Sequence, residues 1–375
     1  MKPKVAIVHD WMVSPGGGEK VVLALHKLWP EAPIYTAAYE PARFPEFAQA
    51  DIRTLWLDRI QLAKRKHQLF SIPRAWAFRS LDLSDYDIVI SSSSAESKYV
   101  KTGPKTLHIC YCHTPIRYYW SDYDWYRQHP PFGWLNPLAR VVLPLLIPLL
   151  RMQDFRAAQK VDVFVANSKH VQQRIRRYYD RDSAVIYPPV EVKRIRMGVG
   201  PGKYYLVLGR QVAYKRLDLA VEAFNRLGLP LVVAGTGEEI EVQRPKAQSN
   251  IKFVGRPTDE QKAKLYQTAK ALVFAAEEDF GIVPVEAQAA GRPVIAYGVG
   301  GATESVVDGV TGVLFKPQTA EALGKAVERS SQTVWNPTAI RRQAEKFDES
   351  VFSQRIRQFV LDEWRKFQAK GPSSR

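Results

Sequence analysis

Short apolar runs alternate with stretches of helical periodicity along the whole chain. In residues 20–28, for example, apolar side chains recur at helical spacing, which predicts an amphipathic helix. The apolar runs of the first half predict strands at residues 5–8, 34–37, 87–92, 106–111, 162–168 and 184–187. Helices between successive strands are typical of a parallel sheet that is covered on both faces.

The same alternation of predicted strands and helices begins again after Pro188 and Pro189, which end the first run of strands. The second half predicts strands at residues 204–209, 231–237, 251–255, 271–276, 293–297 and 312–315, with helices at 217–227 and 259–269. A chain of 375 residues is long enough for two domains. We therefore predict an α/β protein with two Rossmann-like domains, residues 1–190 and 191–350.

Two carboxylates flank one predicted strand-to-helix turn in the second domain. Glu278 follows the strand at 271–276, and Glu286 falls in the first turn of a short helix that Gly291 closes. Turns at the carboxyl edge of a parallel sheet are where open α/β folds bind nucleotides. A carboxylate there can accept two hydrogen bonds from a ribose diol. The second carboxylate can hold hydroxyls of the group that the nucleotide carries.

A basic turn follows the predicted strand at 204–209. It carries Arg210, whose guanidinium can bridge two phosphate oxygens, and Lys215, which adds a compact positive charge. The alternative is a solvated basic turn. The predicted position of this turn, on the same sheet edge as Glu278, favours a pyrophosphate site.

The first strand-to-helix loop contains Gly17 and Gly18, which let a ligand approach the backbone N–H groups at a helix start. Val21 stands where the dinucleotide fingerprint requires its third glycine, so a dehydrogenase is not predicted. Tight turns also need glycine for their own sake, so a purely structural role stays open.

His113 follows the predicted strand at 106–111, which places it at a sheet edge. A histidine there can share a proton or bind a sugar hydroxyl. Aromatic residues, whose faces suit the apolar side of sugar rings, crowd around it at positions 111, 118, 119, 120, 123, 125 and 126. The same cluster fits a protein core, and a structural histidine stays open.

The formal net charge is +16, and the positive excess is spread over both halves. Such a surface favours polyanions, namely nucleic acid, anionic lipid or a phosphate-bearing substrate. The run Lys64, Arg65 and Lys66 is the candidate contact with a membrane or an acceptor, and Trp76 and Phe78 would add apolar anchoring. The usual interpretation of such a run, a solvated helix face, stays open.

The apolar stretch within residues 132–150 is too short, and too rich in proline, to span a bilayer. It fits a patch that dips into the membrane interface or an irregular buried helix, and both stay open. The two cysteines, Cys110 and Cys112, are one residue apart, which disfavours a disulfide between them and matches no usual metal spacing. Low cysteine use and the absence of a signal-like N-terminus favour a cytoplasmic protein.

Together these residues resemble the retaining glycosyltransferases of the GT-B fold, specifically family 4. The family's motif of two glutamates with seven residues between them matches Glu278 and Glu286, although Asp279 stands where glycine is more common. The segment 209–215 matches the family's phosphate clamp, and residues 16–19 match its first-domain glycine loop. The resemblance covers most of the chain.

The resemblance implies two Rossmann-like domains that face each other across a cleft, with a last helix at about 351–370 packed back on the first domain. It implies catalytic roles for His113, Glu278, Arg210 and Lys215. Glu286 would bind the ribose, Glu278 the transferred sugar, and the two cations the departing diphosphate. The implied donor-binding residues are Gly17, Gly18, Arg210, Lys215, Glu278, Phe280, Gly281, Ile282 and Glu286.

Residues 111–120 look like the mannosyltransferase-like branch that builds bacterial surface polysaccharides. That branch implies transfer of a hexose, mannose from GDP-mannose, to a lipid-linked or oligosaccharide acceptor. It implies no metal, no other cofactor and no nucleic-acid partner. Arg117 and residues 64–66 would face the acceptor or an anionic membrane. We therefore expect a cytoplasmic enzyme that associates peripherally with the inner face of the plasma membrane.

Other interpretations remain. A UDP-sugar-dependent glycosyltransferase of the same fold differs only in the donor. A GT-B epimerase would convert a UDP-sugar without an acceptor. A protein of another class, a non-catalytic binder of anionic polymers, would explain the charge but not the paired glutamates.

Overall fold

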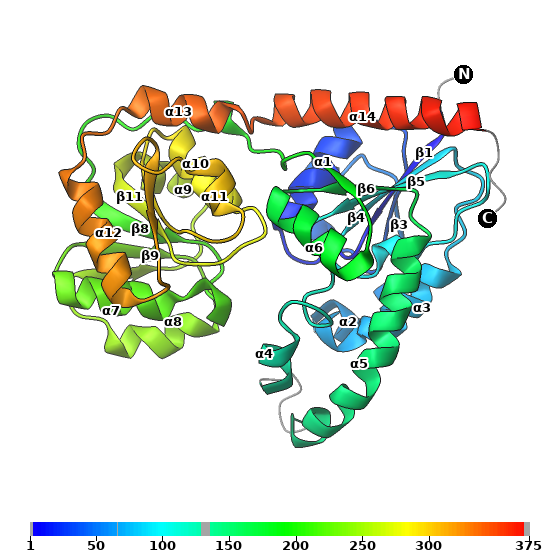
Figure 1. Ribbon diagram of the computed structural model, residues 1–375, viewed down its shortest axis with the longest axis horizontal. Helices are drawn as coiled ribbons and strands as arrows, with labels where there is room; N and C mark the ends of the chain where they lie inside the picture. The colour runs from blue at the N-terminus through cyan, green and yellow to red at the C-terminus, as the bar shows by residue number, and fades with distance from the viewer. Residues whose placement is uncertain (1–2, 66, 129–135, 371–375) are drawn as a thin grey trace. The chain divides into compact units, whose positions relative to one another are not determined.

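The computed structural model describes residues 3–65, 67–128 and 136–370, and it divides into two compact units. The first unit comprises Met1–Tyr187 and Ser353–Arg375, and the second comprises Pro188–Phe352. The predicted domain boundaries at residues 190 and 350 lie within a few residues of this division. The predicted last helix is α14 (Glu349–Lys370), which enters the first unit at Ser353 (Figure 1).

The second unit contains a six-stranded parallel sheet in the order β10-β9-β8-β11-β12-β13. Its strands are β8 (Tyr204–Leu208), β9 (Leu231–Ala234), β10 (Ile251–Val254), β11 (Ala269–Phe274), β12 (Val294–Tyr297) and β13 (Gly312–Phe315). The chain builds outward from β8 to β10 and then restarts on the other side at β11. The order therefore reverses between β8 and β11, which is where such sheets bind ligands.

Helices cover both faces of this sheet (Figure 1). One core holds Phe224, Ile240 and Leu323, and it joins the sheet to α7 (Leu217–Leu227), α8 (Glu238–Gln243) and α12 (Ala320–Gln332). The opposite core holds Tyr266 and Ala287. Its helices are α9 (Asp259–Thr268), α10 (Ile282–Ala289) and α11 (Ala302–Ser305), and α13 (Pro337–Glu345) packs on α10. Glu286 therefore falls in the second turn of α10, not in the first, because the helix starts before Pro284.

The first unit contains a seven-stranded parallel sheet in the order β3-β2-β1-β4-β5-β6-β7. Its strands are β1 (Val5–His9), β2 (Ile34–Thr36), β3 (Ile52–Thr54), β4 (Ile88–Ser93), β5 (Leu107–Cys112), β6 (Val163–Ala166) and β7 (Ser183–Val185). Its helices, besides α14, are α1 (Gly17–Leu28), α2 (Gln61–Arg65), α3 (Ser71–Ser80), α4 (Tyr123–Gln128), α5 (Asn136–Gln159) and α6 (Lys169–Tyr179). The strand order reverses between β1 and β4.

Helix α5 changes the interpretation of the apolar stretch at 132–150, whose first residues, to 135, lie outside the described part. Pro144 and Pro148 both lie inside one continuous helix. Ile147 and Leu150 are buried, whereas the opposite side is exposed, so the stretch is neither irregular nor fully buried. Within the described residues, no helix has the length and apolarity to cross a bilayer.

A buried carboxylate ties α5 to the rest of the first unit. Asp154 is fully buried, and its Oδ1 lies 2.7 Å from Nζ of Lys98, which is also buried. The other donors to this carboxylate are the Tyr99 hydroxyl at 3.0 Å, the Trp120 indole N–H at 2.7 Å and the Tyr179 hydroxyl at 2.8 Å. Asp154 raises the pKa of Lys98 against the lowering effect of burial, so the lysine stays charged.

We expect Asp154→Ala to destabilise the protein by about 3–5 kcal/mol, because it leaves the buried Lys98 charge unpaired. Asp182→Ala is the matched control, since this carboxylate is 97% exposed and its ion pair with Arg176 contributes about 0–1 kcal/mol. Urea unfolding, followed by far-UV circular dichroism, measures both. Equal midpoints for the two variants would contradict the structural role of Asp154.

Candidate functional site

Two oppositely charged loops meet at the switch point of the second sheet, which is the place between β8 and β11 where the strand order reverses. Strands β8 and β11 are hydrogen-bonded neighbours, with Leu206 opposite Leu272. The loop after β8 carries Arg210 and Lys215, and the loop after β11 carries Glu278. The topology therefore brings together three of the residues that the sequence analysis selected.

Lys215 and Glu278 form an ion pair, with 2.6 Å between Nζ and Oε1. Both side chains are largely buried, at 16% and 17% exposure. Burial lowers the pKa of Lys215, but the Glu278 carboxylate outweighs this effect and leaves the pKa above its ordinary value. The Lys215 ammonium is therefore positive at neutral pH, and it is held at the carboxyl edge of the sheet.

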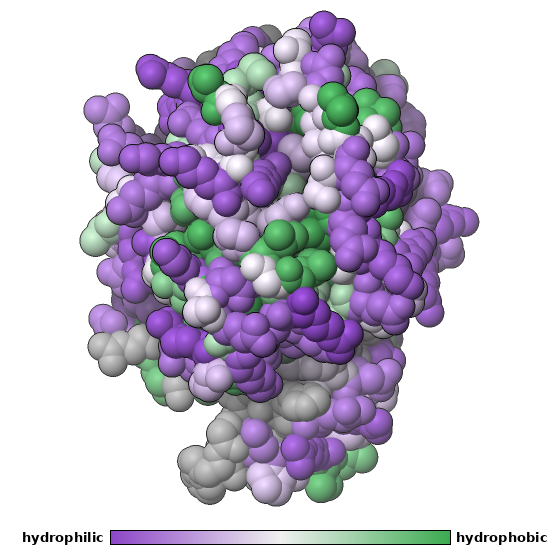
Figure 2. All heavy atoms as spheres, turned by 90° about the vertical axis from the view of Figure 1, so that its left-hand side faces the viewer, coloured by the Kyte–Doolittle hydropathy of each residue, from purple (hydrophilic) through white to green (hydrophobic). Residues whose placement is uncertain are grey.

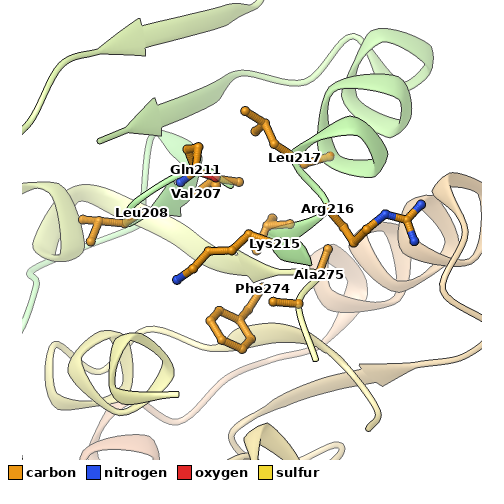
Figure 3. Close-up of a pocket in the computed structure, with 11 residues that line it drawn as sticks. Val207, Leu208, Gln211, Lys215, Arg216, Leu217, Phe274 and Ala275 are labelled. Atoms are coloured by element: carbon orange, nitrogen blue, oxygen red, sulfur yellow. The ribbon is translucent and has the colours of Figure 1, made fainter. Parts of the chain in front are cut away.

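The other two cations of this turn have different surroundings. Arg210 is exposed, and its charge lowers the pKa of Lys215 slightly, so the two positive groups lie near each other. Arg216 points away from Lys215 (Figure 3), and its guanidinium binds Asp218 at 2.9 Å and Gln318 at 3.2 Å. Arg210 and Lys215 are thus the pair available to an anion, while Arg216 ties the loop to α7 and to Gln318.

Glycines hold both loops in place by close backbone contact. A Cβ on Gly301 would lie 2.2 Å from Cα of Phe280, and the Gly301 N–H donates to the Glu278 carbonyl at 2.8 Å. In the same way, Gly235 has a φ of +137°, and a Cβ there would lie 1.9 Å from the Gly209 carbonyl oxygen. Only glycine permits these approaches, so both charged loops are braced by the turns beside them.

A small cavity of about 20 Å³ lies below Lys215, between β8, β11 and α7. Gln211 lines it and is 1% exposed (Figure 3). Its Nε2 donates to the Gly209 carbonyl at 2.9 Å, whereas its Oε1 is buried without a hydrogen-bond partner among the described residues. The cavity has room for one water molecule that could donate to this oxygen.

Glu286 is almost completely buried and both of its oxygens accept hydrogen bonds from α9. Lys262 donates to Oε1 and the Tyr266 hydroxyl donates to Oε2, each at 2.7 Å. Burial and the negative Glu286 raise the pKa of Tyr266 well above its usual range, so the tyrosine remains a donor. A ribose diol at Glu286 must therefore share the carboxylate with Lys262 or displace it.

The other residues of the second unit that were predicted to bind the donor surround the start of α10. Gly281 caps the helix with a φ of +84°, and Ile282 is the first helical residue. The Phe280 side chain is 3% exposed, and its ring centroid lies 5.4 Å from that of Phe347. The Phe280 ring therefore belongs to the core and does not offer a face to a sugar, whereas the start of α10 favours an anion.

A second polar cluster lies at the switch point of the first sheet. His113 follows β5, and its Nε2 lies 2.8 Å from the Ser92 hydroxyl on β4. Nδ1 of His9, the last residue of β1, lies 3.0 Å from the Ser92 carbonyl oxygen and 3.2 Å from the Ser92 hydroxyl. A Cβ on Gly18 would lie 3.1 Å from the His9 ring and 3.6 Å from Nε2 of His113, so the glycine loop lies beside both histidines.

Charged groups surround His9. Its Nε2 lies 3.7 Å from Oε1 of Glu19, in the first turn of α1. Burial lowers the pKa of His9, but Glu19 and Asp10 outweigh it and leave the pKa raised. For Asp10, His9 and the backbone N–H groups of Ser94 and Ser97 outweigh burial and lower the pKa. Both shifts favour the charged forms of His9 and Asp10 at this part of the sheet edge.

Two of the four predicted acceptor or membrane residues, Lys64 and Arg117, are paired with carboxylates within the first unit. Arg117 lies 3.6 Å from Asp122, and Lys64 is paired with Asp58 at 2.9 Å. The Arg65 side chain and Lys66 lie outside the described part of the chain. Trp76 is 71% exposed, but Phe78 is fully buried, so the prediction that Phe78 adds surface anchoring is wrong.

The sequence analysis missed His9, Ser92 and Glu19 as site residues. His9 and Ser92 become neighbours through the parallel register of β1 and β4, which a single sequence does not reveal. A usable signal was present, since His9 directly follows a predicted strand and residues 91–94 form a serine run at the end of another. Lys262 was missed because it reaches Glu286 from a separate helix.

Comparison with known families identifies the class of protein. The model "Glycosyltransferase Family 4" matches residues 15–194, and "Glycosyl transferases group 1" matches residues 196–346. The first match covers β2 to β7 of the first sheet, and the second covers all six strands of the second sheet. The chain therefore belongs to the glycosyltransferases that combine these two family domains, and it is a transferase with the GT-B fold.

Individual relatives agree with this assignment. O-antigen chain mannosyltransferase C of Escherichia coli is 29% identical over 252 residues, which is 58% of this chain and 67% of that protein. Alpha-1,3/1,6-mannosyltransferase ALG2 of Homo sapiens is 26% identical over 415 aligned positions, which cover 96% of each chain. The crystal structure of Anabaena Alr3699/HepE in complex with UDP-glucose has a TM-score of 0.70 and 18% identity, and it covers 96% of this chain and 99% of that one. The predicted fold class and the predicted enzyme class are confirmed.

We expect Gly301→Ala to destabilise the protein by about 1–3 kcal/mol, because the new methyl group collides with the backbone that carries Glu278. Gly324→Ala is the control, since it meets nothing within 4 Å and lies inside α12, where alanine stabilises by about 0.5–1 kcal/mol. Urea titrations with tryptophan fluorescence measure both. An unfolding midpoint for Gly301→Ala at or above the parent value would refute the bracing role.

Proposed function

We propose that the protein transfers mannose from GDP-mannose, with retention, to a lipid-linked or oligosaccharide acceptor in surface polysaccharide synthesis. The observation that carries the assignment is the buried Lys215–Glu278 pair at the switch point of the second sheet. The choice of mannose is supported by relatives, which include two mannosyltransferases along 58% and 96% of the chain.

The proposed chemistry requires a fixed positive field at the leaving diphosphate. Breaking the sugar–phosphate bond leaves negative charge on the β-phosphate and an oxocarbenium-like sugar. Lys215, Arg210 and the start of α10 lie at one edge of the same sheet, and all three favour an anion there. These groups supply the charge stabilisation without a metal, and we propose that the reaction is metal-independent.

The two glutamates have separate proposed roles. Glu278 is 17% exposed and is paired with Lys215. It can therefore accept hydrogen bonds from hydroxyls of the transferred sugar while it orients Lys215. Glu286 is assigned to the ribose, which would enter the contact that Lys262 now makes. His113 is assigned to the reaction centre, as the family resemblance implies.

The stereochemistry follows from the absence of an assigned nucleophile. Glu278 is paired with Lys215 and is assigned to the sugar hydroxyls, and Glu286 is assigned to the ribose, so neither carboxylate is assigned as a nucleophile. We therefore propose attack of the acceptor on the same face from which the diphosphate departs, with the leaving phosphate accepting the acceptor's proton. This route conserves the anomeric configuration.

We expect Lys215→Met to weaken GDP-mannose binding tenfold or more, because it removes a charge-assisted contact worth about 1.5–3 kcal/mol. Lys325→Met, at an exposed position in the same unit, should change the affinity by less than twofold. Calorimetric titration at fixed ionic strength gives both constants, and the unfolding midpoint verifies that each variant is folded. Equal affinities for the parent and Lys215→Met would contradict the proposed role of Lys215 at the diphosphate.

The donor is tested separately with the parent protein. GDP-mannose should support transfer to a polyprenyl-diphosphate-linked sugar, and UDP-glucose should be a poorer donor at equal concentration. A preference for UDP-glucose would exclude the mannose assignment, but it would not contradict the proposed role of Arg210 and Lys215 in binding the diphosphate. Loss of transfer on adding a chelator would contradict the metal-independent mechanism.

We also propose that helix α5 contacts an anionic membrane surface that presents the acceptor. Its exposed side carries a stripe of large apolar residues, namely Val141, Val142, Leu145, Leu149, Met152 and Phe155. Exposed Arg140 and Arg156 lie at the two ends of this stripe. By contrast, the face of the molecule in Figure 2 is mainly hydrophilic, and its apolar residues form small separate patches. An apolar stripe with flanking cations matches an interfacial helix.

We expect Leu145→Glu to reduce binding to vesicles that contain phosphatidylglycerol by about tenfold, because Leu145 is 75% exposed at the centre of the stripe. Val334→Glu adds the same charge at a residue of the second unit that is 98% exposed, and it should leave binding unchanged. Co-sedimentation at two salt concentrations measures this and should show weaker binding at high salt. Equal loss in both variants would indicate a charge effect without an apolar contact.

A further inference from the structure

The residues His9, Ser92 and His113 form one continuous hydrogen-bonded chain across three neighbouring strands. His9 ends β1, Ser92 lies in β4 directly opposite it, and His113 follows β5. His9 is 4% exposed and Ser92 is fully buried, so the chain is shielded from solvent up to the half-buried His113. The ring centroids of the two histidines lie 6.4 Å apart, and Ser92 bridges them.

The direction of the first hydrogen bond in this chain follows from a group that can only accept. The Ser92 carbonyl oxygen carries no hydrogen, so Nδ1 of His9, at 3.0 Å, must donate to it. The same N–H also faces the Ser92 hydroxyl oxygen at 3.2 Å, which therefore acts as an acceptor from His9. A hydroxyl that accepts from His9 keeps its own hydrogen for a second partner, and Nε2 of His113 lies within reach of it at 2.8 Å.

The charges around His9 support this arrangement. Oε1 of Glu19, on α1, lies 3.7 Å from Nε2 of His9, and Asp10 is the next residue in the chain. On the other side of Ser92, the titratable group is His113. Arg74 of α3 acts on Asp10 and lowers its pKa together with His9. The nearest charges are therefore the two carboxylates, which favour a proton on each ring nitrogen of His9.

We propose that His9 is a positioning residue which acts through Ser92 to keep the neutral His113 in the tautomer with its proton on Nδ1. Nε2 of His113 accepts the Ser92 hydrogen bond and so carries no proton, which leaves the ring's other nitrogen as the donor. The role of His113 in transfer rests on the proposed function. The proposed tautomer does not, because it concerns only hydrogen bonds within the first unit.

Four substitutions separate this role from a simple packing role. His9→Asn keeps a side-chain N–H near the place of Nδ1, whereas His9→Leu fills the site without a donor. Ser92→Ala removes the bridge between the two histidines. Glu19→Gln removes the carboxylate next to Nε2 of His9, and it should lower the pKa of His9 without changing the tautomer of His113.

The test is ¹⁵N–¹H NMR of the full-length protein labelled at histidine, which distinguishes Nδ1–H from Nε2–H tautomers. The parent, His9→Asn and Glu19→Gln should show His113 protonated at Nδ1, while His9→Leu and Ser92→Ala should shift it toward Nε2–H. Retention of the Nδ1–H tautomer in folded His9→Leu would overturn the proposal. A parent protein that already carries the proton on Nε2 would overturn it as well.

Kinetics then connect the tautomer to transfer. His9→Leu should lower kcat at least tenfold with little change in the KM for the donor, and His9→Asn should recover most of the loss. If the parent transfers no mannose but the tautomer changes as stated, the proposed function fails and the positioning role stands. If mannose is transferred and the variants leave both kcat and the tautomer unchanged, the positioning role fails alone.

Discussion

The ion pair between Lys215 and Glu278 is the interaction on which the proposed diphosphate site of this protein depends. Its two members belong to loops that are distant in sequence, and only the reversal of strand order between β8 and β11 makes them neighbours. Because both side chains are largely buried, removal of one leaves the other uncompensated. The pair is held by the sheet and braced by glycine turns such as Gly301, and it places a positive charge where we propose that the diphosphate binds.

The first unit also places polar groups where its strand order reverses, but these groups differ in their chemistry. Its switch point, between β1 and β4, holds a histidine–serine–histidine chain in place of a lysine–glutamate pair. In both units the polar groups lie at the carboxyl ends of neighbouring strands, where backbone groups and helix starts remain available to a ligand. Asp154 shows the contrasting case, because its carboxylate is satisfied by four donors and serves packing alone.

Much of the fold could be predicted from the sequence, because buried parallel strands appear as continuous apolar runs. The positions of Lys215 and Glu278 could be predicted as well, since each follows such a run. The partners of Glu286 could not, because Lys262 and Tyr266 approach from α9, and helix packing leaves no local signal. For residues 132–150 the sequence left an interfacial patch and a buried helix open, because an apolar run does not state which of its sides the rest of the unit covers.

The most direct test of the central claim is a double-mutant cycle on Lys215→Met and Glu278→Gln, read as the affinity for GDP-mannose. The account predicts that the two effects are not additive, with a coupling of about 0.5–3 kcal/mol, because the residues form one unit at the diphosphate. Additivity within about 0.3–0.5 kcal/mol would mean that the two side chains act independently, and it would contradict the account.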